Sequence, residues 1–282
     1  MDTPPDPEPV ALRRARVVLA YDGAGFHGFA AAAGVRTVMG SLLEAVSRIS
    51  RLTVESLGAV GAGRTDAGVH AWGQVVSLDV PETLALDSLV NRLNKMLGPE
   101  ISVRSAIWAA PAFNARFDAQ WRHYRYDVWN AASAVPVYAG TAWHLRQPLQ
   151  LWAMQLACDP LIGEHDFSSF CRKPKVADGQ PVPSMRRRVI SAGWHVVPDD
   201  HHPAGEQHDP EVDGLGLVRF EIRANAFCQQ MVRSIVGLLV DVGLGRRHAG
   251  EVSGVLAAHD RAAGGQIAPP HGLTLWDVGY PS

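Results

Sequence analysis

Apolar positions recur along this 282-residue chain with two different periods, and the two periods separate expected helices from expected strands. Spacings of three and four residues, as in Val38, Leu42, Val46 and Ile49 after Thr37, predict an amphipathic helix with a capped start. Alternating or densely β-branched runs predict strands. These criteria predict helices at 37–51, 86–96, 149–161, 228–242 and 251–259, and strands at 16–21, 53–60, 74–80, 101–109, 121–129, 187–197, 217–224 and 273–278.

The order of these elements predicts an α+β protein with two halves, each with strands first and helices packed on one side. We expect a disordered acidic and proline-rich tail at 1–11, an N-terminal lobe at 12–111 and a C-terminal lobe at 112–282. Within the second lobe, residues 198–214 are acidic and histidine-rich with almost no large apolar side chain, which predicts an exposed excursion. The tail resembles neither a signal peptide nor a transit peptide, and no apolar run reaches the roughly 18 residues that span a bilayer.

The charge balance is uneven along the chain. The formal net charge is −2, which at first argues against a nucleic-acid partner. Nine acids lie in the tail and the excursion, so the remainder carries 26 basic and 19 acidic side chains, or +7. Arginine dominates that excess and suits bidentate phosphate contact. On charge alone, an RNA-binding surface and an arginine-rich composition without a function explain the pattern equally well.

The cysteines are few and widely spaced. Cys158, Cys171 and Cys228 are odd in number and form no CxxC pair, which predicts neither a disulfide framework nor a zinc site. The histidines of 198–214 show no regular ligand spacing, so a solvated loop is favoured over a metal site. Together these features predict a cytoplasmic protein without a membrane partner.

The segment from Gly61 to His70 carries the strongest chemical pattern. Its three glycines allow backbone conformations that other residues avoid and let a ligand approach closely. Asp66 lies in this loop beside Arg64, and a neighbouring guanidinium favours an ionised carboxylate. An aspartate in a loop is often only a turn residue, but the Arg-Thr-Asp triplet favours a functional carboxylate.

This loop, with the Trp72-Gly73-Gln74-Val75 run after it, resembles the signature of the tRNA pseudouridine synthase A (TruA) family. The resemblance extends from about residue 15 to residue 280. Five further stretches agree in order and spacing: Tyr21–Gly28, Phe113–Phe117, Tyr124–Tyr126, Gly163–Phe170 and Asn225–Gly237.

The resemblance implies a pseudouridine synthase fold, with two α/β lobes, antiparallel sheets and a catalytic cleft between them. It also implies a homodimer that isomerises uridine to pseudouridine in the anticodon stem-loop of tRNA, at uridines 38–40, without a cofactor or a metal. Asp66 resembles the essential aspartate, acting on the ribose either as a nucleophile or as a base through a glycal. Arg64 and Arg233 are expected to flank it, and Tyr124 is expected to stack on the target base. The side chains expected to grip phosphates are Arg116, Arg122, Arg125, Arg172, Lys173, Lys175, Arg186, Arg187 and Arg188.

Two departures leave the substrate detail open. The family usually continues with Trp-Gln after Gly28, where this chain has Phe29–Ala33, and Met39 replaces a usual Gln. A non-catalytic RNA-binding or RNA-folding protein on the same scaffold is the main alternative, although it predicts an altered Asp66 motif. A glycoside hydrolase would need a second acid at a controlled distance. Asp22 is the nearest candidate for that acid and is expected to be a turn residue.

Overall fold

The computed structural model of the protein describes residues 10–173, 183–198 and 215–281. Most of the predicted tail and excursion, together with Lys175, therefore lies outside the described residues. The strands are β1 (Leu12–Tyr21), β2 (Val60–Gly61), β3 (His70–Pro81), β4 (Ile101–Trp108), β5 (Trp121–Asn130), β6 (Trp143–Leu145), β7 (Gly163–Asp166), β8 (Arg186–Val196), β9 (Gly216–Ala224) and β10 (Leu273–Gly279).

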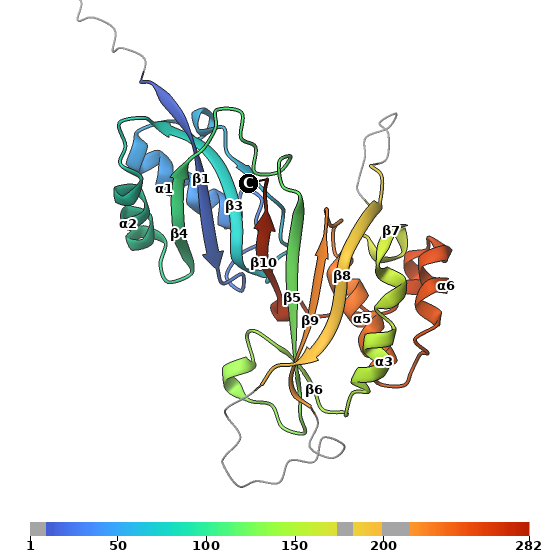
Figure 1. Cartoon of the computed structure of the whole chain (residues 1–282). Coiled ribbons are helices and arrows are strands. Elements are labelled where there is room, and N and C mark those ends of the chain that lie inside the picture. Colours follow the sequence, from blue (N-terminus) through green and yellow to red (C-terminus); the bar gives the residue numbers. More distant parts are fainter. Residues whose placement is uncertain (1–9, 174–182, 199–214, 282) are drawn as a thin grey trace, which may run out of the picture.

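Within these described ranges the strands form one ten-stranded sheet in the order β4-β1-β3-β10-β5-β9-β8-β7, with β2 beside β3 and β6 beside β5 (Figure 1). Neighbouring strands are antiparallel except for the pairs β10–β3 and β5–β6. The predicted α+β class with a largely antiparallel sheet is therefore confirmed. The sheet runs without a break past residue 111, and the division into two lobes stays a prediction.

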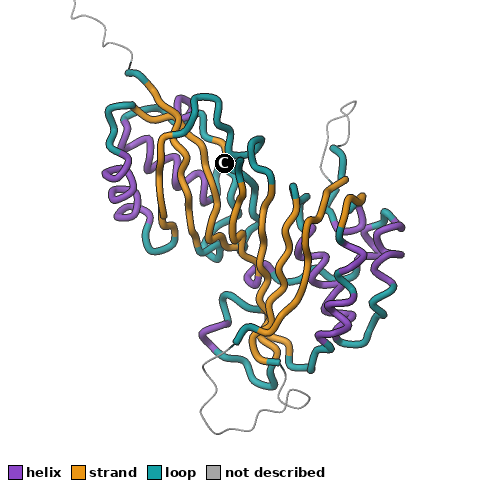
Figure 2. Tube along the Cα trace, viewed as in Figure 1, coloured by secondary structure: helices purple, strands orange, loops and turns teal. Residues whose placement is uncertain are grey.

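Helices lie on one side of the sheet in two groups (Figure 2). They are α1 (Val38–Ser50) and α2 (Leu86–Leu97) beside the N-terminal strands, and α3 (Leu151–Leu156), α5 (Met231–Gly243) and α6 (Glu251–Ala258) beside the C-terminal strands. Single 3-10 turns occur at η1 (Glu55–Leu57), η2 (Pro136–Tyr138), η3 (Asp159–Leu161), η4 (Ser168–Phe170), η5 (Arg261–Gly264) and η6 (Pro270–Gly272).

Local signals explain where α1 begins and ends. The Thr37 hydroxyl accepts a hydrogen bond from the Gly40 amide at 3.2 Å, which confirms the predicted cap. The helix buries its apolar stripe and ends at Arg51, whose φ of 60° is left-handed. α5 has no such polar face, because all of its residues are buried except Arg233 and Asp241. Arg233 is therefore the one basic side chain of an otherwise apolar helix.

The C-terminal strand lies in the middle of the sheet, between β3 and β5. β10 pairs in parallel with β3 through Thr274 and His70, and antiparallel with β5 through Leu273 and Tyr126. The sequence predicts this strand but not its place, because neighbours in a sheet can be far apart along the chain. As a result, β10 brings the segment that follows the glycine loop next to the strand that carries Tyr124.

Two predicted elements are wrong in part. Residues 53–60 form η1 and a two-residue strand, because the Thr53 hydroxyl bonds the Ser56 hydroxyl and amide and so favours a turn. The helix predicted to reach residue 161 ends at Leu156, since Pro160 restricts the residue before it and starts a separate turn. The short strand β7 was not predicted, as it has only four residues.

Tyr126, Phe167 and Phe170 are fully buried and belong to the core. No helix in the described part of the chain is long and apolar enough to cross a membrane.

Candidate active site

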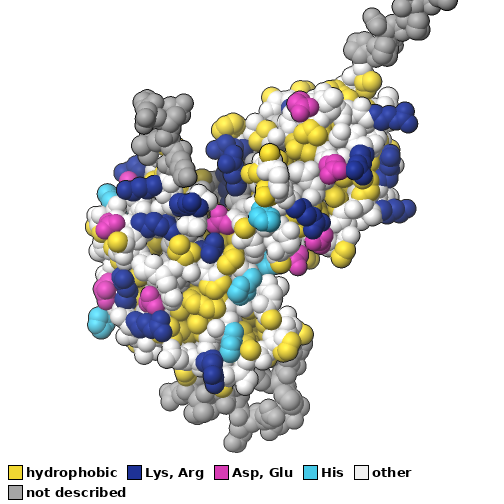
Figure 3. Space-filling model, turned by 180° about the vertical axis from the view of Figure 1, so that it is seen from behind, with side chains coloured by type: hydrophobic (Ala, Val, Ile, Leu, Met, Phe, Trp, Pro, Cys, Tyr) yellow, Lys and Arg dark blue, Asp and Glu magenta, His cyan; other side chains and the backbone are white. Residues whose placement is uncertain are grey.

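A cavity of about 1000 Å³ lies on the helix side of the sheet. Its floor includes Arg122 and Tyr124 of β5, one wall is the loop from Gly61 to Val69, and the opposite wall is the 226–233 segment that leads into α5. Figure 3 shows this side of the molecule, where Lys and Arg side chains gather around the hollow between the two halves. The loop with the strongest sequence pattern therefore faces the late helix across one cavity.

The glycine loop connects β2 to β3 and is held from behind. The Thr65 carbonyl accepts from the Phe29 amide at 3.1 Å. At Gly28, φ is +98° and a Cβ atom would lie 3.1 Å from the same carbonyl, so the close approach requires glycine. The first loop of the chain thereby fixes the backbone beside Asp66.

Buried side chains complete this support. The Tyr21 hydroxyl and the Thr65 hydroxyl share a hydrogen bond of 2.8 Å, and the Gln74 amide donates to the Gly63 carbonyl at 2.9 Å. Burial raises the pKa of Tyr21 to about 12, so it remains an uncharged hydrogen-bonding group behind the loop. These contacts hold the backbone before Asp66, which lines the cavity together with the rest of the loop.

Asp66 and Arg233 form an ion pair across the cavity. The Arg233 Nη1 lies 3.4 Å from the Asp66 Oδ2, and the two side chains are 14% and 23% exposed. The Arg233 Nε also donates to the Ala268 carbonyl at 2.8 Å, which fixes the direction of the guanidinium. Among the described residues that line the cavity, Asp66 is the only carboxylate.

Arg64 lies at the same cavity but does not take this role. Its side chain is exposed, and no ion pair joins it to Asp66. Sequence proximity made Arg64 the nearest guanidinium, whereas the structure gives the contact to a residue 167 positions away. The two positively charged side chains therefore differ, with Arg233 inside the site and Arg64 toward solvent.

Tyr124 forms an aromatic part of the floor. It is 7% exposed and meets the Phe227 ring edge-on at a centroid distance of 5.0 Å. Burial raises the pKa of Tyr124 above its ordinary value, and the nearby Tyr21 and Asp66 raise it further. The hydroxyl therefore remains protonated at neutral pH. Tyr126, on the same strand face, instead donates to the Pro269 carbonyl and lies outside the cavity lining.

The candidate phosphate-binding side chains do not all reach the cavity. Arg116, Arg122, Arg172 and Arg187 line it. Arg125 instead pairs with Glu221 and covers Trp276 at 3.6 Å from the ring centroid, and Arg186 pairs with Glu164.

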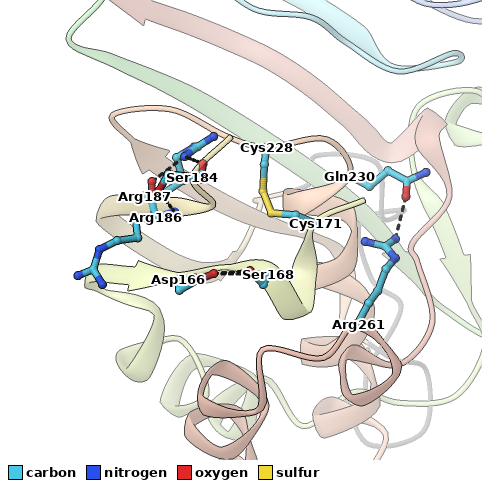
Figure 4. The surroundings of a disulfide bond; sticks show 9 residues. All are labelled: Asp166, Ser168, Cys171, Ser184, Arg186, Arg187, Cys228, Gln230 and Arg261. Atoms are coloured by element: carbon cyan, nitrogen blue, oxygen red, sulfur yellow. Dashed lines mark hydrogen bonds between the residues drawn. A yellow bond between two sulfur atoms is a disulfide. The ribbon is translucent and has the colours of Figure 1, made fainter. Parts of the chain in front are cut away.

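A disulfide corrects the prediction made from cysteine spacing. Cys171 and Cys228 are bonded, with their Cα atoms 5.7 Å apart (Figure 4). The buried Cys158 is free. The odd count and the separation of 57 residues hid this pairing, because only folding brings the two segments together. Cys228 lines the cavity, and the neighbouring Arg172 amide donates to the Gln229 carbonyl at 3.0 Å. The bond therefore fastens the 226–233 wall of the cavity to the segment that follows η4.

Phe227 and Gln230 also line the cavity and had no assigned role in the sequence. Gln230 directly precedes α5 and has a left-handed φ of 67°, and its side-chain oxygen accepts from Arg261 at 2.7 Å (Figure 4). Phe227 was noted only within a motif, since an aromatic residue near an apolar helix does not by itself distinguish a cavity wall from a core.

Comparisons with known proteins identify the family of this chain. Residues 157–281 match a family model described as tRNA pseudouridine synthase. A protein named tRNA pseudouridine synthase A from Brevibacillus brevis is 38% identical over 269 residues, covering 95% of this chain and 100% of the relative. Proteins of the same name from Corynebacterium glutamicum and Streptomyces griseus are each 38% identical, covering 95% of this chain and 90% and 88% of the relatives.

The similarity extends through the glycine loop, the Tyr124 strand and the late helix, the three parts that meet at the cavity. The chain belongs to the tRNA pseudouridine synthase A family.

Proposed function

We propose that the protein is an isomerase that converts uridine to pseudouridine in the anticodon stem-loop of tRNA, at uridines 38–40. The observation that carries the proposal is the Asp66–Arg233 pair beside Tyr124 in a single cavity. The non-catalytic alternative is not favoured, because the carboxylate motif is intact and its side chain faces the cavity.

The reaction breaks the bond from uracil N1 to the ribose and forms a new one from uracil C5. C5 loses its hydrogen as a proton to water, and N1 gains a proton. A base inside a helix or loop must leave its stack to reach a carboxylate inside a cavity. We assign Asp66 to the ribose, either as a nucleophile or as a base, and Arg233 to holding Asp66 in place. Tyr124 would support the detached uracil, and Arg116 with its exposed neighbours would hold the RNA backbone. No cofactor or metal is part of this proposal.

Release of a label from uracil C5 tests the reaction directly. Transcribed tRNA carrying tritium at uracil C5 is incubated with the protein, and tRNAs lacking a uridine at position 38, 39 or 40 identify the target. We expect release that depends on these uridines. Absence of release on every tRNA tried would refute the enzyme proposal.

Replacing Tyr124 separates base stacking from proton transfer. Tyr124→Leu removes the ring, and we expect kcat/KM to fall by about 5- to 150-fold, which corresponds to the 1–3 kcal/mol typical of base stacking. Tyr124→Phe keeps the ring and should retain substrate affinity, while a lower kcat would assign a role to the hydroxyl. Steady-state kinetics measure both, and a Leu variant with normal kcat/KM would contradict the assignment.

Affinity for tRNA is expected to depend strongly on salt. Exposed arginines at the cavity, such as Arg64, Arg116 and Arg172, would neutralise phosphates and release counterions. With about four such contacts, affinity should fall by about 50- to 150-fold between 50 and 200 mM salt. Filter binding with the Asp66→Asn variant measures this without turnover, and a flat salt profile would exclude a basic binding surface.

We further propose that the protein is a homodimer whose interface uses the helix-free face of the sheet. On that face Trp72, which is 47% exposed, stacks on Trp276 at a centroid distance of 5.5 Å. Arg104 and Arg125 cover the outer sides of the two rings. Such a combination of tryptophan and arginine is typical of interface centres.

Light scattering should give a mass twice the 30.4 kDa of one chain. Trp72→Asp should yield monomers, whereas the control Trp152→Asp, at a 71% exposed position on α3, should remain dimeric. A parent protein with the mass of one chain would contradict the dimer, and a dimeric Trp72 variant would contradict this interface.

We place the protein in the cytoplasm, where its proposed substrate is found. Cytoplasmic thiols are kept reduced, so the disulfide between Cys171 and Cys228 would there either withstand cellular reductants or be reduced to two thiols. Cell fractionation tests the location, and recovery of the protein outside the cytoplasmic fraction would refute it.

A further inference from the structure

Arg122 is expected from sequence to grip phosphates, but its guanidinium has no free donor. All five of its hydrogen bonds go to main-chain carbonyl oxygens. Nε and Nη2 donate to Ala62 at 3.3 and 2.8 Å, Nη2 donates to Arg116 at 2.6 Å, and Nη1 donates to Ala119 and Asn225 at 3.0 and 2.8 Å. Because a guanidinium has five N–H groups, these bonds occupy all of them.

Two of the four carbonyls, those of Ala62 and Asn225, belong to the segments on opposite sides of the active-site cavity. Ala62 lies in the glycine loop, four residues before Asp66. Asn225 lies in the connection from β9 to α5, which carries Phe227 and leads to Arg233. Arg122 itself is two residues before Tyr124, on the same face of β5. The Arg122 side chain therefore connects β5, the strand that carries Tyr124, to both walls of the cavity.

The electrostatics fit this role. Arg122 is 8% exposed, and within the described ranges no carboxylate forms an ion pair with it. Burial lowers the pKa of its guanidinium, with the nearby Arg116 charge acting in the same direction. A buried charge without an ionic partner persists only where dipoles surround it, and carbonyl oxygens supply those dipoles here.

We propose that Arg122 is a positioning residue that holds the Asp66 loop and the β9–α5 connection at the correct distance from Tyr124, and that it does not bind RNA phosphate. The part of this inference that concerns catalysis rests on the proposed function. The effect of Arg122 on the backbone around the cavity can be measured whether or not the protein is active.

Three variants distinguish the roles. Arg122→Met keeps much of the volume but removes every donor, and Arg122→Lys keeps the charge with only three donors. Arg116→Met is the matched control, because that exposed side chain lines the same cavity and donates none of these bonds. Each variant is measured by amide hydrogen exchange, by the single-turnover rate of C5 label release, and by the salt slope of tRNA binding.

For Arg122→Met we expect faster exchange at residues 62–68 and 225–230 and a single-turnover rate reduced by about 100-fold, as is typical when reacting groups are displaced by about 1 Å. Its salt slope should match the parent. For Arg122→Lys we expect exchange and a single-turnover rate between those of the parent and those of Arg122→Met. Arg116→Met should leave exchange unchanged and reduce the magnitude of the salt slope by about 0.7–0.9, the value for one phosphate contact.

A lower salt slope in Arg122→Met with normal exchange would identify a phosphate contact and overturn the proposal. Normal exchange and a normal rate in a folded variant would also overturn it. If Arg122→Met does not fold, Arg122→Lys decides by the same measurements. If the parent releases no label, the proposed function fails, while the exchange comparison still tests whether Arg122 positions the loop.

Discussion

Asp66→Asn is expected to lower label release by about 10⁴-fold or more, the size of loss seen when a reacting group is removed. The substitution keeps the shape of the side chain and removes its charge and nucleophilicity. Asp66 is the only carboxylate among the described residues that line the cavity, so no neighbour can replace it. Single-turnover assays with excess enzyme measure the effect without interference from product release.

The matched control is Asp22→Asn. The Asp22 carboxylate is largely exposed and accepts from the Ala24 amide at 2.9 Å, as expected of a turn residue. This variant should retain activity within a few-fold of the parent. Substantial release by Asp66→Asn would refute the assignment of the catalytic carboxylate, and equal losses in both variants would instead favour a two-acid mechanism.

Arg233→Met is expected to reduce turnover by about 10²- to 10³-fold, because Asp66 would lose the contact that directs its carboxylate across the cavity. Stability should change much less than activity. The Asp66 side chain is 23% exposed, so water can still reach its carboxylate after the Arg233 guanidinium is removed. Single-turnover rates and thermal unfolding of the same preparation measure the two effects together.

Arg246→Met provides the control for a change of charge alone. Arg246 is an exposed arginine that pairs with Asp241 at 3.1 Å, away from the cavity. It should leave both turnover and melting temperature close to the parent. Near-normal turnover in Arg233→Met would contradict the pairing, and a melting temperature lowered enough to explain the lost activity would assign Arg233 to stability.

Local elements could be predicted because their causes lie within a few residues. The Thr37 cap, the apolar stripe of α1 and the alternation in β5 each depend on neighbours along the chain. The errors arose where local causes compete. The hydrogen bonds of the Thr53 hydroxyl favour a turn where a strand was expected, and Pro160 begins a separate turn where a helix was expected to continue.

The candidate site was predicted in its residues but not in its contacts. Asp66, Tyr124 and Arg233 could be named from motifs. Their distances depend on the register of the sheet and on the packing of α5, which no local pattern encodes. For the same reason Arg64 and Arg233 were both expected to flank Asp66, although only Arg233 pairs with it, and the cysteine pair was not expected.

The sequence by itself determined the helices and most strands, the carboxylate in a glycine loop and the resemblance to a family of RNA-modifying isomerases. Tertiary structure alone decided that β10 lies between β3 and β5, that Arg233 rather than Arg64 pairs with Asp66, and that Arg122 binds backbone rather than facing solvent. The physical reason is that periodicity and capping act over a few residues. The environment of a charged side chain depends instead on segments that only the folded sheet brings together.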